Sequence, residues 1–175
     1  MGDFIADIYA EITGCDVILI GSGTLRVKEF GPVVTLGELK EMIPYADSYL
    51  CFLVKGEKLL KIFSHFLRTE NCNNDGECFQ VNHNVKAIYS KNKDHLETLL
   101  IRGEPVQLDM EFSLGIQGFH FQNSKANLDV SQEELLKLDG KKVVTSSFIS
   151  VVEEYLHGNH VISCPEVEGR LVYID

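Results

Sequence analysis

The sequence lacks three features that define large classes of protein: an excess of basic charge, a long apolar run and a secretory leader. Its 175 residues carry 16 lysines and arginines against 26 aspartates and glutamates, so the formal net charge is -10. This charge opposes a nucleic-acid polymer as a partner, because binding a phosphate backbone requires a basic surface. No apolar run approaches the length of a membrane span, and the acidic, amphipathic N-terminus has no secretory signal pattern. What remains is one domain, long enough to bury a real core.

Tryptophan is absent and the cysteines are scattered, at Cys15, Cys51, Cys72, Cys78 and Cys164. Cys15 and Cys51 flank or occupy apolar stretches and are expected to behave as small core residues. Cys72 and Cys78 bracket a polar loop, where the spacing fits either a local disulfide in an exported protein or two free thiols. A zinc site made from these two cysteines and His83 would have poor ligand spacing, so no metal is expected in this chain.

The most informative stretch runs from residue 16 to residue 45. Residues 17–20 are apolar without alternation, which predicts a strand covered on both faces. Gly21 and Gly23 follow at once and permit a sharp turn and a close approach of another group. Arg26 stands just after them, and a guanidinium beside a bare backbone turn suits an anion or a ribose. The turn lacks the spacing of a P-loop or a dinucleotide fingerprint, so a tight strand exit with a solvent-facing arginine is the alternative.

Apolar spacing and capping signals predict a mixture of helices and strands along the chain. Two capping boxes, Thr35–Glu38 and Ser131–Glu134, each predict the start of a helix, and Pro44 ends the first of these. An apolar periodicity typical of helices occurs in residues 3–13, 59–67 and 145–156. Strand-like runs fall at residues 49–54, 79–81, 85–89, 99–101 and 111–116.

The order of these motifs resembles the C-terminal domain of the 5'-nucleotidase family over nearly the whole chain. In that family an apolar strand leads to Asn-Gly-Gly-Gly-Ile-Arg, then to Gly-x-(Ile/Val)-Thr, a helix and Pro-Phe-Gly. Residues 21–26, 31–35 and 44–46 stand in those places here. Further matches fall on residues 54–59, 78–83, 102–106 and 166–173. The resemblance implies an α+β fold, with helices packed on mixed sheets in an α/β/β/α layering, for the whole of residues 1–175.

The same resemblance implies a division of labour with a second domain. Family members hydrolyse phosphate esters with two divalent metals, held by Asp, His and Asn of an N-terminal metallophosphoesterase domain. The characteristic Asp-x-His and Gly-Asn-His-Glu strings do not occur in this sequence. The chain is therefore expected to be a domain of a longer protein, with that metal domain as its partner and with no activity of its own. Family members are usually exported, and the compartment of this chain stays open.

The resemblance also assigns candidate residues for binding a nucleoside or nucleotide. Two aromatic residues of the family clamp the base, and they fall on Tyr45 and Phe119. Stacking of a base on an aromatic side chain contributes about 1–3 kcal/mol. Arg26 falls on an arginine that contacts ribose or phosphate, beside the turn formed by Gly21 and Gly23. For each aromatic residue the alternative is an ordinary place in the core.

Two departures from the family pattern weaken this assignment and define a second hypothesis. Gly21 replaces the asparagine of the turn, so one polar contact is lost. Lys125 replaces the aspartate that accepts hydrogen bonds from the ribose hydroxyls, and a lysine has no acceptor to offer. Lys125 could instead attract a phosphate or another acidic group. The second hypothesis is therefore a degenerate, non-catalytic homologue that binds another anionic ligand or serves as an interaction module.

Overall fold

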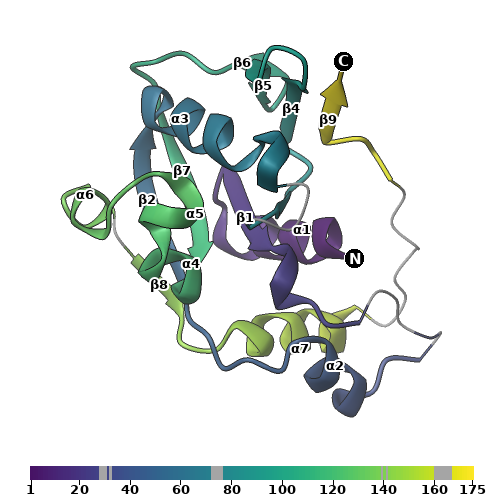
Figure 1. Cartoon of the computed structure of the whole chain (residues 1–175). Coiled ribbons are helices and arrows are strands. Elements are labelled where there is room, and N and C mark those ends of the chain that lie inside the picture. The colour runs from purple at the N-terminus through teal and green to yellow at the C-terminus, as the bar shows by residue number, and fades with distance from the viewer. Residues whose placement is uncertain (28–30, 32, 72–76, 139, 141, 160–166) are drawn as a thin grey trace.

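The chain folds into two mixed β-sheets with helices packed around them (Figure 1). The computed structural model describes residues 1–27, 31, 33–71, 77–138, 140, 142–159 and 167–175. Its helices are α1 (Gly2–Thr13), η1 (a 3-10 turn, Ser22–Thr24), α2 (Leu36–Met42), α3 (Gly56–Phe66), α4 (Gly118–Gln122), α5 (Ser124–Leu128), α6 (Gln132–Leu136) and α7 (Phe148–Gly158). Its strands are β1 (Val17–Gly21), β2 (Tyr49–Lys55), β3 (Phe79–Val81), β4 (Val85–Ser90), β5 (His95–Ile101), β6 (Glu104–Pro105), β7 (Glu111–Gln117), β8 (Lys142–Thr145) and β9 (Leu171–Ile174).

The larger sheet has the strand order β3-β1-β7-β2-β8, so β7 lies at its centre. It pairs in parallel with β1, Val17 opposite Leu114, and antiparallel with β2 along seven residue pairs. The smaller sheet has the order β6-β5-β4-β9 and is antiparallel except where β9 joins β4. The predicted α+β class with mixed sheets is confirmed.

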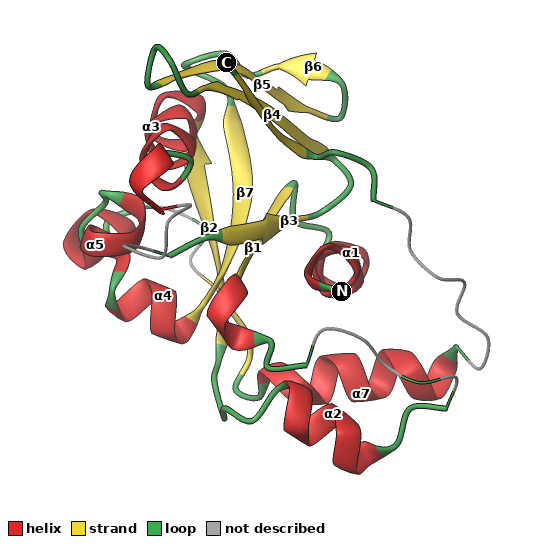
Figure 2. Cartoon of the chain, turned by 45° about the vertical axis from the view of Figure 1, so that its right-hand side comes forward, coloured by secondary structure: helices red, strands yellow, loops and turns green. Residues whose placement is uncertain are grey.

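Strand β1 is buried on both faces, as its unbroken apolar run predicts. Val17 and Leu19 point into a core shared with α3 and the smaller sheet. Ile18 and Ile20 point the other way, into a core shared with α1, α2 and α7. Figure 2 shows α3 and α1 on opposite sides of this strand. Burying such a side chain contributes about 1.5–3 kcal/mol, so β1 is a main anchor of the fold.

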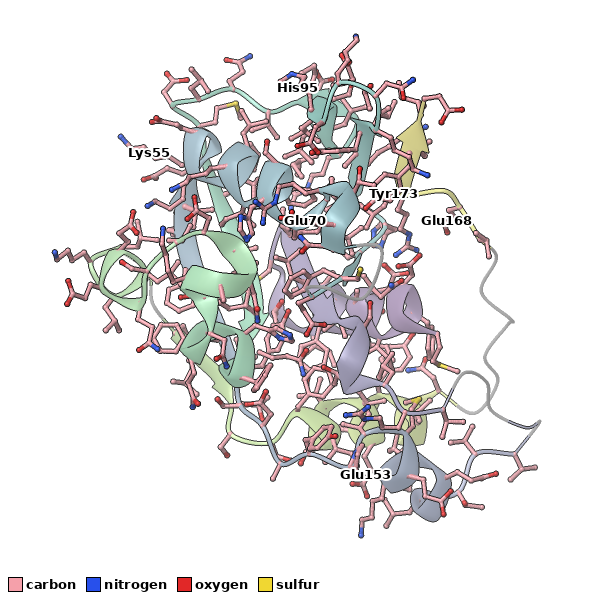
Figure 3. The ribbon with its side chains drawn as sticks, viewed as in Figure 1. Lys55, Glu70, His95, Glu153, Glu168 and Tyr173 are labelled. Carbon is pink, nitrogen blue, oxygen red and sulfur yellow. The ribbon has the colours of Figure 1, made fainter. Side chains whose placement is uncertain are left out.

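The helix ends follow the capping signals of the sequence. Both predicted capping boxes are present, at Thr35 for α2 and at Ser131 for α6. Leu36, the first residue of α2, is 46% exposed. It lines a small groove together with Glu153 of α7. Figure 3 labels Glu153, near α2. Only the later residues of α2 reach the core.

The observed boundaries differ from the predicted ones where elements are short. Helix α7 begins at Phe148 rather than at residue 145, because residues 142–145 form the edge strand β8. Strand β5 begins at His95, well before the apolar residues 99–101. Helices α4 and α5 have five residues each, and neither was predicted, since so few residues show no periodicity.

Arg170 ties the C-terminal strand to the first helix. Its side chain is 6% exposed and donates to both carboxylate oxygens of Asp7, at 2.9 and 2.7 Å. The same guanidinium donates to the carbonyl of Val81 at 2.8 Å and to Glu168 at 3.1 Å. Figure 3 labels Glu168 and Tyr173 on this C-terminal segment, next to the smaller sheet. The two ends of the described chain are thus joined through one buried cation.

Candidate functional site

A cavity of about 530 Å³ opens where β1 and β7 end. Because these strands are parallel, their carboxyl ends meet at one edge of the sheet, a common place for ligands in open α/β sheets. The antiparallel β2 starts at the same edge, so the segment before it also reaches the cavity. The lining comes from four such segments: Gly23, Thr24, Arg26, Tyr45, Ala46, Asp47, Glu77, Gln117, Phe119, His120 and Gln122.

Arg26 and Tyr45 form one wall of the cavity. An Nη2 hydrogen of Arg26 is donated to the Tyr45 hydroxyl, and the guanidinium carbon lies 5.2 Å from the centre of the Tyr45 ring. The Arg26 backbone N–H donates to the carbonyl of Met42 at 2.9 Å, which fixes the chain after the glycine turn. Arg26 is therefore held over an aromatic face at the cavity, and most of its five donors stay available.

Phe119 also lines the cavity, at the start of α4, and the residue is 55% exposed. Its backbone N–H donates to Asp47 Oδ2 at 3.1 Å, while Ser48 N–H donates to Asp47 Oδ1 at 2.8 Å. Asp47 follows Tyr45 by two residues, so one carboxylate couples the segments that carry the two aromatic side chains. Gly118 makes this approach possible, because a Cβ there would lie 2.6 Å from Asp47 Oδ1.

The floor of the cavity is built on a buried glutamine. Gln117 Oε1 accepts hydrogen bonds from the Gly21 N–H at 3.1 Å and from the Thr24 hydroxyl at 2.9 Å. These bonds hold the turn that carries Gly23 against the end of β7. Gly23 lines the cavity, whereas Gly21 is buried beneath it.

His120 and Glu77 lie beside that turn and were not predicted as site residues. The His120 side chain is 2% exposed, and neither ring nitrogen has a hydrogen-bond partner within the described residues, although Nε2 lies 3.6 Å from Glu77 Oε2. A Cβ on Gly21 would lie 2.2 Å from His120 Cε1. The imidazole thus fills the space into which a side chain at residue 21 would project. His120 directly follows the candidate residue Phe119, and this position is a signal from which it could have been found. Glu77 lies in a polar loop, and the sequence gives no sign that it belongs to the site.

The structure does not bring Lys125 to the cavity. Lys125 lies on α5, 69% exposed, and its amine forms an ion pair with Asp129 one turn later. Lys61 approaches the other oxygen of Asp129 at 3.1 Å. The hydrogen bond from Lys125, with the second from Lys61, lowers the pKa of Asp129 to about 2. The charge of Lys125 is therefore engaged on the flank of α5.

No metal centre is formed by the part of the chain that the structure describes. Within the described ranges, no group of three histidine, cysteine or acidic side chains is placed to hold a metal ion. Cys72 lies outside the described residues, so its suggested bridge to Cys78 is not tested. The Cys78 thiol donates to the carbonyl of Asn71 at 3.1 Å. Among the described helices, none is long and apolar enough to cross a membrane.

Sequence comparison identifies the class of domain that this fold and cavity define. Residues 1–132 match the 5'-nucleotidase, C-terminal domain family, and the chain belongs to that family. A search of curated proteins finds no match.

Solved structures share the fold at low sequence identity. A 5'-nucleotidase precursor from Thermus thermophilus is 17% identical, with a TM-score of 0.81 over 99% of this chain and 35% of its own. A nucleotidase for NAD from Haemophilus influenzae is 10% identical, with a TM-score of 0.73 over 99% of this chain and 33% of its own. A protein described as a putative 5'-nucleotidase from Staphylococcus aureus is 13% identical, with a TM-score of 0.71 over 98% and 36%. The chain thus spans roughly a third of each of these proteins.

Proposed function

We propose that the cavity binds a nucleoside or nucleotide, with the base between Tyr45 and Phe119 and with Arg26 on the sugar-phosphate side. The observation that carries this proposal is the meeting of two exposed aromatic side chains and a cation around one cavity, although they come from distant parts of the sequence. An exposed aromatic side chain contributes little to folding, so two of them on one cavity indicate a ligand. The volume of about 530 Å³ also suits a small-molecule site.

The chemistry of the lining fits the three parts of a nucleotide. Two aromatic faces suit a flat base, and each contributes about 1–3 kcal/mol by stacking. The guanidinium of Arg26 suits a phosphate or ribose oxygen. The polar atoms of Gln117, Glu77 and His120 can orient the remaining groups. The site therefore combines stacking for affinity with few polar groups for orientation.

In this proposal the domain recognises the substrate of a 5'-nucleotidase-like phosphohydrolase in nucleotide catabolism, and a partner domain performs the hydrolysis. The residues described here do not form a divalent-metal site. A metallophosphoesterase domain of the same protein would hold the metal pair, which activates water and neutralises the phosphoryl charge. The chain's own residues would bind and orient the nucleoside end of the ligand.

The rival function, a degenerate module for another anionic ligand, was based on Gly21 and Lys125. The surroundings of Gly21 and Lys125 in the structure weaken the support that these two residues give to the rival function. His120 occupies the space of a side chain at residue 21, and the Lys125 ammonium is paired with Asp129 outside the cavity.

Calorimetric titration with adenosine, AMP and ADP tests the proposed function. Tyr45→Ala and Phe119→Ala should each weaken binding by about 5- to 150-fold, which corresponds to about 1–3 kcal/mol of stacking. Leu136→Ala is the matched control, since Leu136 is 49% exposed like Tyr45 but lies on α6, outside the cavity. Wild-type affinity in both aromatic variants would refute the clamp. No binding of any of the three ligands to the wild type would favour the rival function.

A further inference from the structure

Two cysteines far apart in the sequence meet inside the domain, away from the cavity. The Sγ atoms of Cys15 and Cys51 lie 2.6 Å apart. Cys15 stands between α1 and β1 and is 3% exposed, whereas Cys51 on β2 is half-buried. The sequence assigned both to ordinary core packing. The contact shows that they form a pair of thiols on one face of the larger sheet.

The architecture of the sheet explains how the two thiols reach each other. Strand β7 separates β1 from β2, and Cys51 lies directly opposite Gly115 of β7. A Cβ on Gly115 would lie 2.7 Å from Tyr49 Cε1 and 2.8 Å from Ile18 Cδ1, on the same face as the two cysteines. The absence of a side chain on Gly115 therefore lets Tyr49 and Ile18 pack over β7, beside the cysteine pair.

A second set of contacts fixes Cys15 in place. The Asp16 N–H donates to Ser113 Oγ at 2.8 Å, and the Ser113 N–H donates to Asp16 Oδ2 at 2.8 Å. The Cys15 N–H donates to Thr13 Oγ1 at 3.1 Å. The backbone on both sides of Cys15 is thus bound to its surroundings. The two sulfur atoms are held close without the need for a large rearrangement.

The contact between the two thiols also gives them different pKa values. A hydrogen bond from the Cys51 thiol is the main reason why the pKa of Cys15 is lowered to about 7, and the same bond raises the pKa of Cys51. Cys15 is therefore the member that ionises first. A thiolate near neutral pH is the form that attacks a disulfide.

We propose that Cys15 and Cys51 form a reversible disulfide by exchange with a small-molecule disulfide such as oxidised glutathione. Cys51, whose sulfur is the more exposed of the two, passes its proton along the hydrogen bond to the Cys15 thiolate and attacks one sulfur of the reagent, so that the first glutathione departs as a thiolate. The Cys15 sulfur then attacks Cys51 Sγ, forms the protein disulfide and releases a second glutathione, which takes the Cys15 proton. Two protein thiols are oxidised, and one reagent disulfide is reduced to two thiols.

The new bond would cross-link the larger sheet from one side of β7 to the other. It joins the segment between α1 and β1 to β2, and β7 lies between those two strands in the sheet. The sulfur atoms need to close only from 2.6 Å to a bonding distance of about 2.0 Å. The bond is therefore compatible with the packing around it.

Peptide mapping of the whole chain, after equilibration with mixtures of reduced and oxidised glutathione and blocking of free thiols, tests the proposal. Trypsin cuts after lysine and arginine, so Cys15 falls in peptide 1–26 and Cys51 in peptide 41–55. Oxidising mixtures should yield these two peptides as one linked species, lighter by two hydrogen atoms than their sum. Reducing mixtures should return the separate peptides.

Two sets of variants complete the test. Cys15→Ser and Cys51→Ser should each abolish the linked species, with circular dichroism as the check of folding. The triple variant with serine at Cys72, Cys78 and Cys164 should keep it, which shows that no other cysteine takes part. A linked species that pairs other cysteines, or glutathione left on Cys51 without closure onto Cys15, would overturn the proposal. So would a wild-type chain whose thiols stay reduced under oxidising conditions.

Discussion

Gly21 decides whether the floor of the cavity can form. Gly21→Ala should destabilise the domain by about 1–3 kcal/mol, because the new Cβ would overlap the buried His120 ring and force a shift. Urea denaturation of the two proteins measures the difference. Gly23→Ala is the matched control from the same turn, since its Cβ would meet nothing closer than Glu77 at 3.9 Å. Equal losses in the two variants would show that the turn, rather than the contact with His120, is responsible.

Lys125 offers a second test at the level of single residues. Lys125→Ala should leave nucleoside binding unchanged and raise the pKa of Asp129 from about 2, because the main hydrogen bond to its carboxylate is lost. The folded-state pKa of Asp129 is depressed. Its stabilising contribution is therefore present above the unfolded pKa and is lost as the pH falls through about 2.

Carboxyl resonances in an NMR titration give the pKa of Asp129, and calorimetry gives the affinity for adenosine. Lys125→Asp is the informative companion variant. If it tightened adenosine binding, a carboxylate at residue 125 would be reaching the ribose, and the location of Lys125 outside the site would be wrong.

Candidate residues that lie within recognisable motifs could be selected from the sequence, and the structure has them on one cavity, while their role in binding stays a prediction. Tyr45 and Arg26 stand in one stretch, and Phe119 ends another, so their assignment needed only motif order. Glu77 and His120 approach each other from segments 43 residues apart in numbering, and apart from the position of His120 after Phe119 neither segment carries a local signal of this contact. Lys125 was assigned by its place in the order of the family motifs, but its ammonium, on the short helix α5, pairs with Asp129 and it is not among the residues that line the cavity. Side-chain direction in such short elements follows from packing rather than from residue type.

At the level of elements, capping boxes and apolar patterns that extend over a long segment were sufficient to predict α1, α2, α3, β2 and β7. Each has at least seven residues with a clear apolar pattern. Strand β8 could not be predicted in the same way. It has only four residues, which pair with β2 and are largely exposed, so they show no apolar pattern. Its structure is imposed by the neighbouring strand.

The attachment of β9 to α1 leads to a prediction about stability. Arg170→Met should destabilise the domain by about 3–5 kcal/mol, because it leaves the Asp7 carboxylate partly buried without its cation. Thermal and urea denaturation measure the loss. Arg102→Met is the control, since Arg102 also pairs with an aspartate, Asp16, at 2.8 Å but is 61% exposed. An exposed pair contributes only about 0–1 kcal/mol, so similar losses in the two variants would contradict a special role for Arg170.

At the scale of the whole molecule, the described residues form a cavity but no metal centre for phosphoryl transfer. We expect the isolated chain not to hydrolyse AMP or UDP-sugars when Mg²⁺, Mn²⁺ or Zn²⁺ is added, because hydrolysis requires an activated water and charge neutralisation at phosphorus. Phosphate release assays on the purified chain check this. This prediction would be refuted by a metal-dependent hydrolytic activity that co-purifies with the folded domain and is lost in the Tyr45→Ala variant.

The central place of β7 also has a consequence for the order in which the chain can fold. Strands β1 and β2 are synthesised before β7, the strand that joins them, which ends only at Gln117. A nascent chain leaving the ribosome therefore exposes two apolar strands, one of them with four fully buried positions in the finished domain, until β7 arrives. Pairings of such high contact order form slowly, and unpaired apolar strands associate with one another while they wait. Strand β7, whose carboxyl end lies at the cavity, thus also determines when the apolar strands β1 and β2 become paired and are no longer free to aggregate.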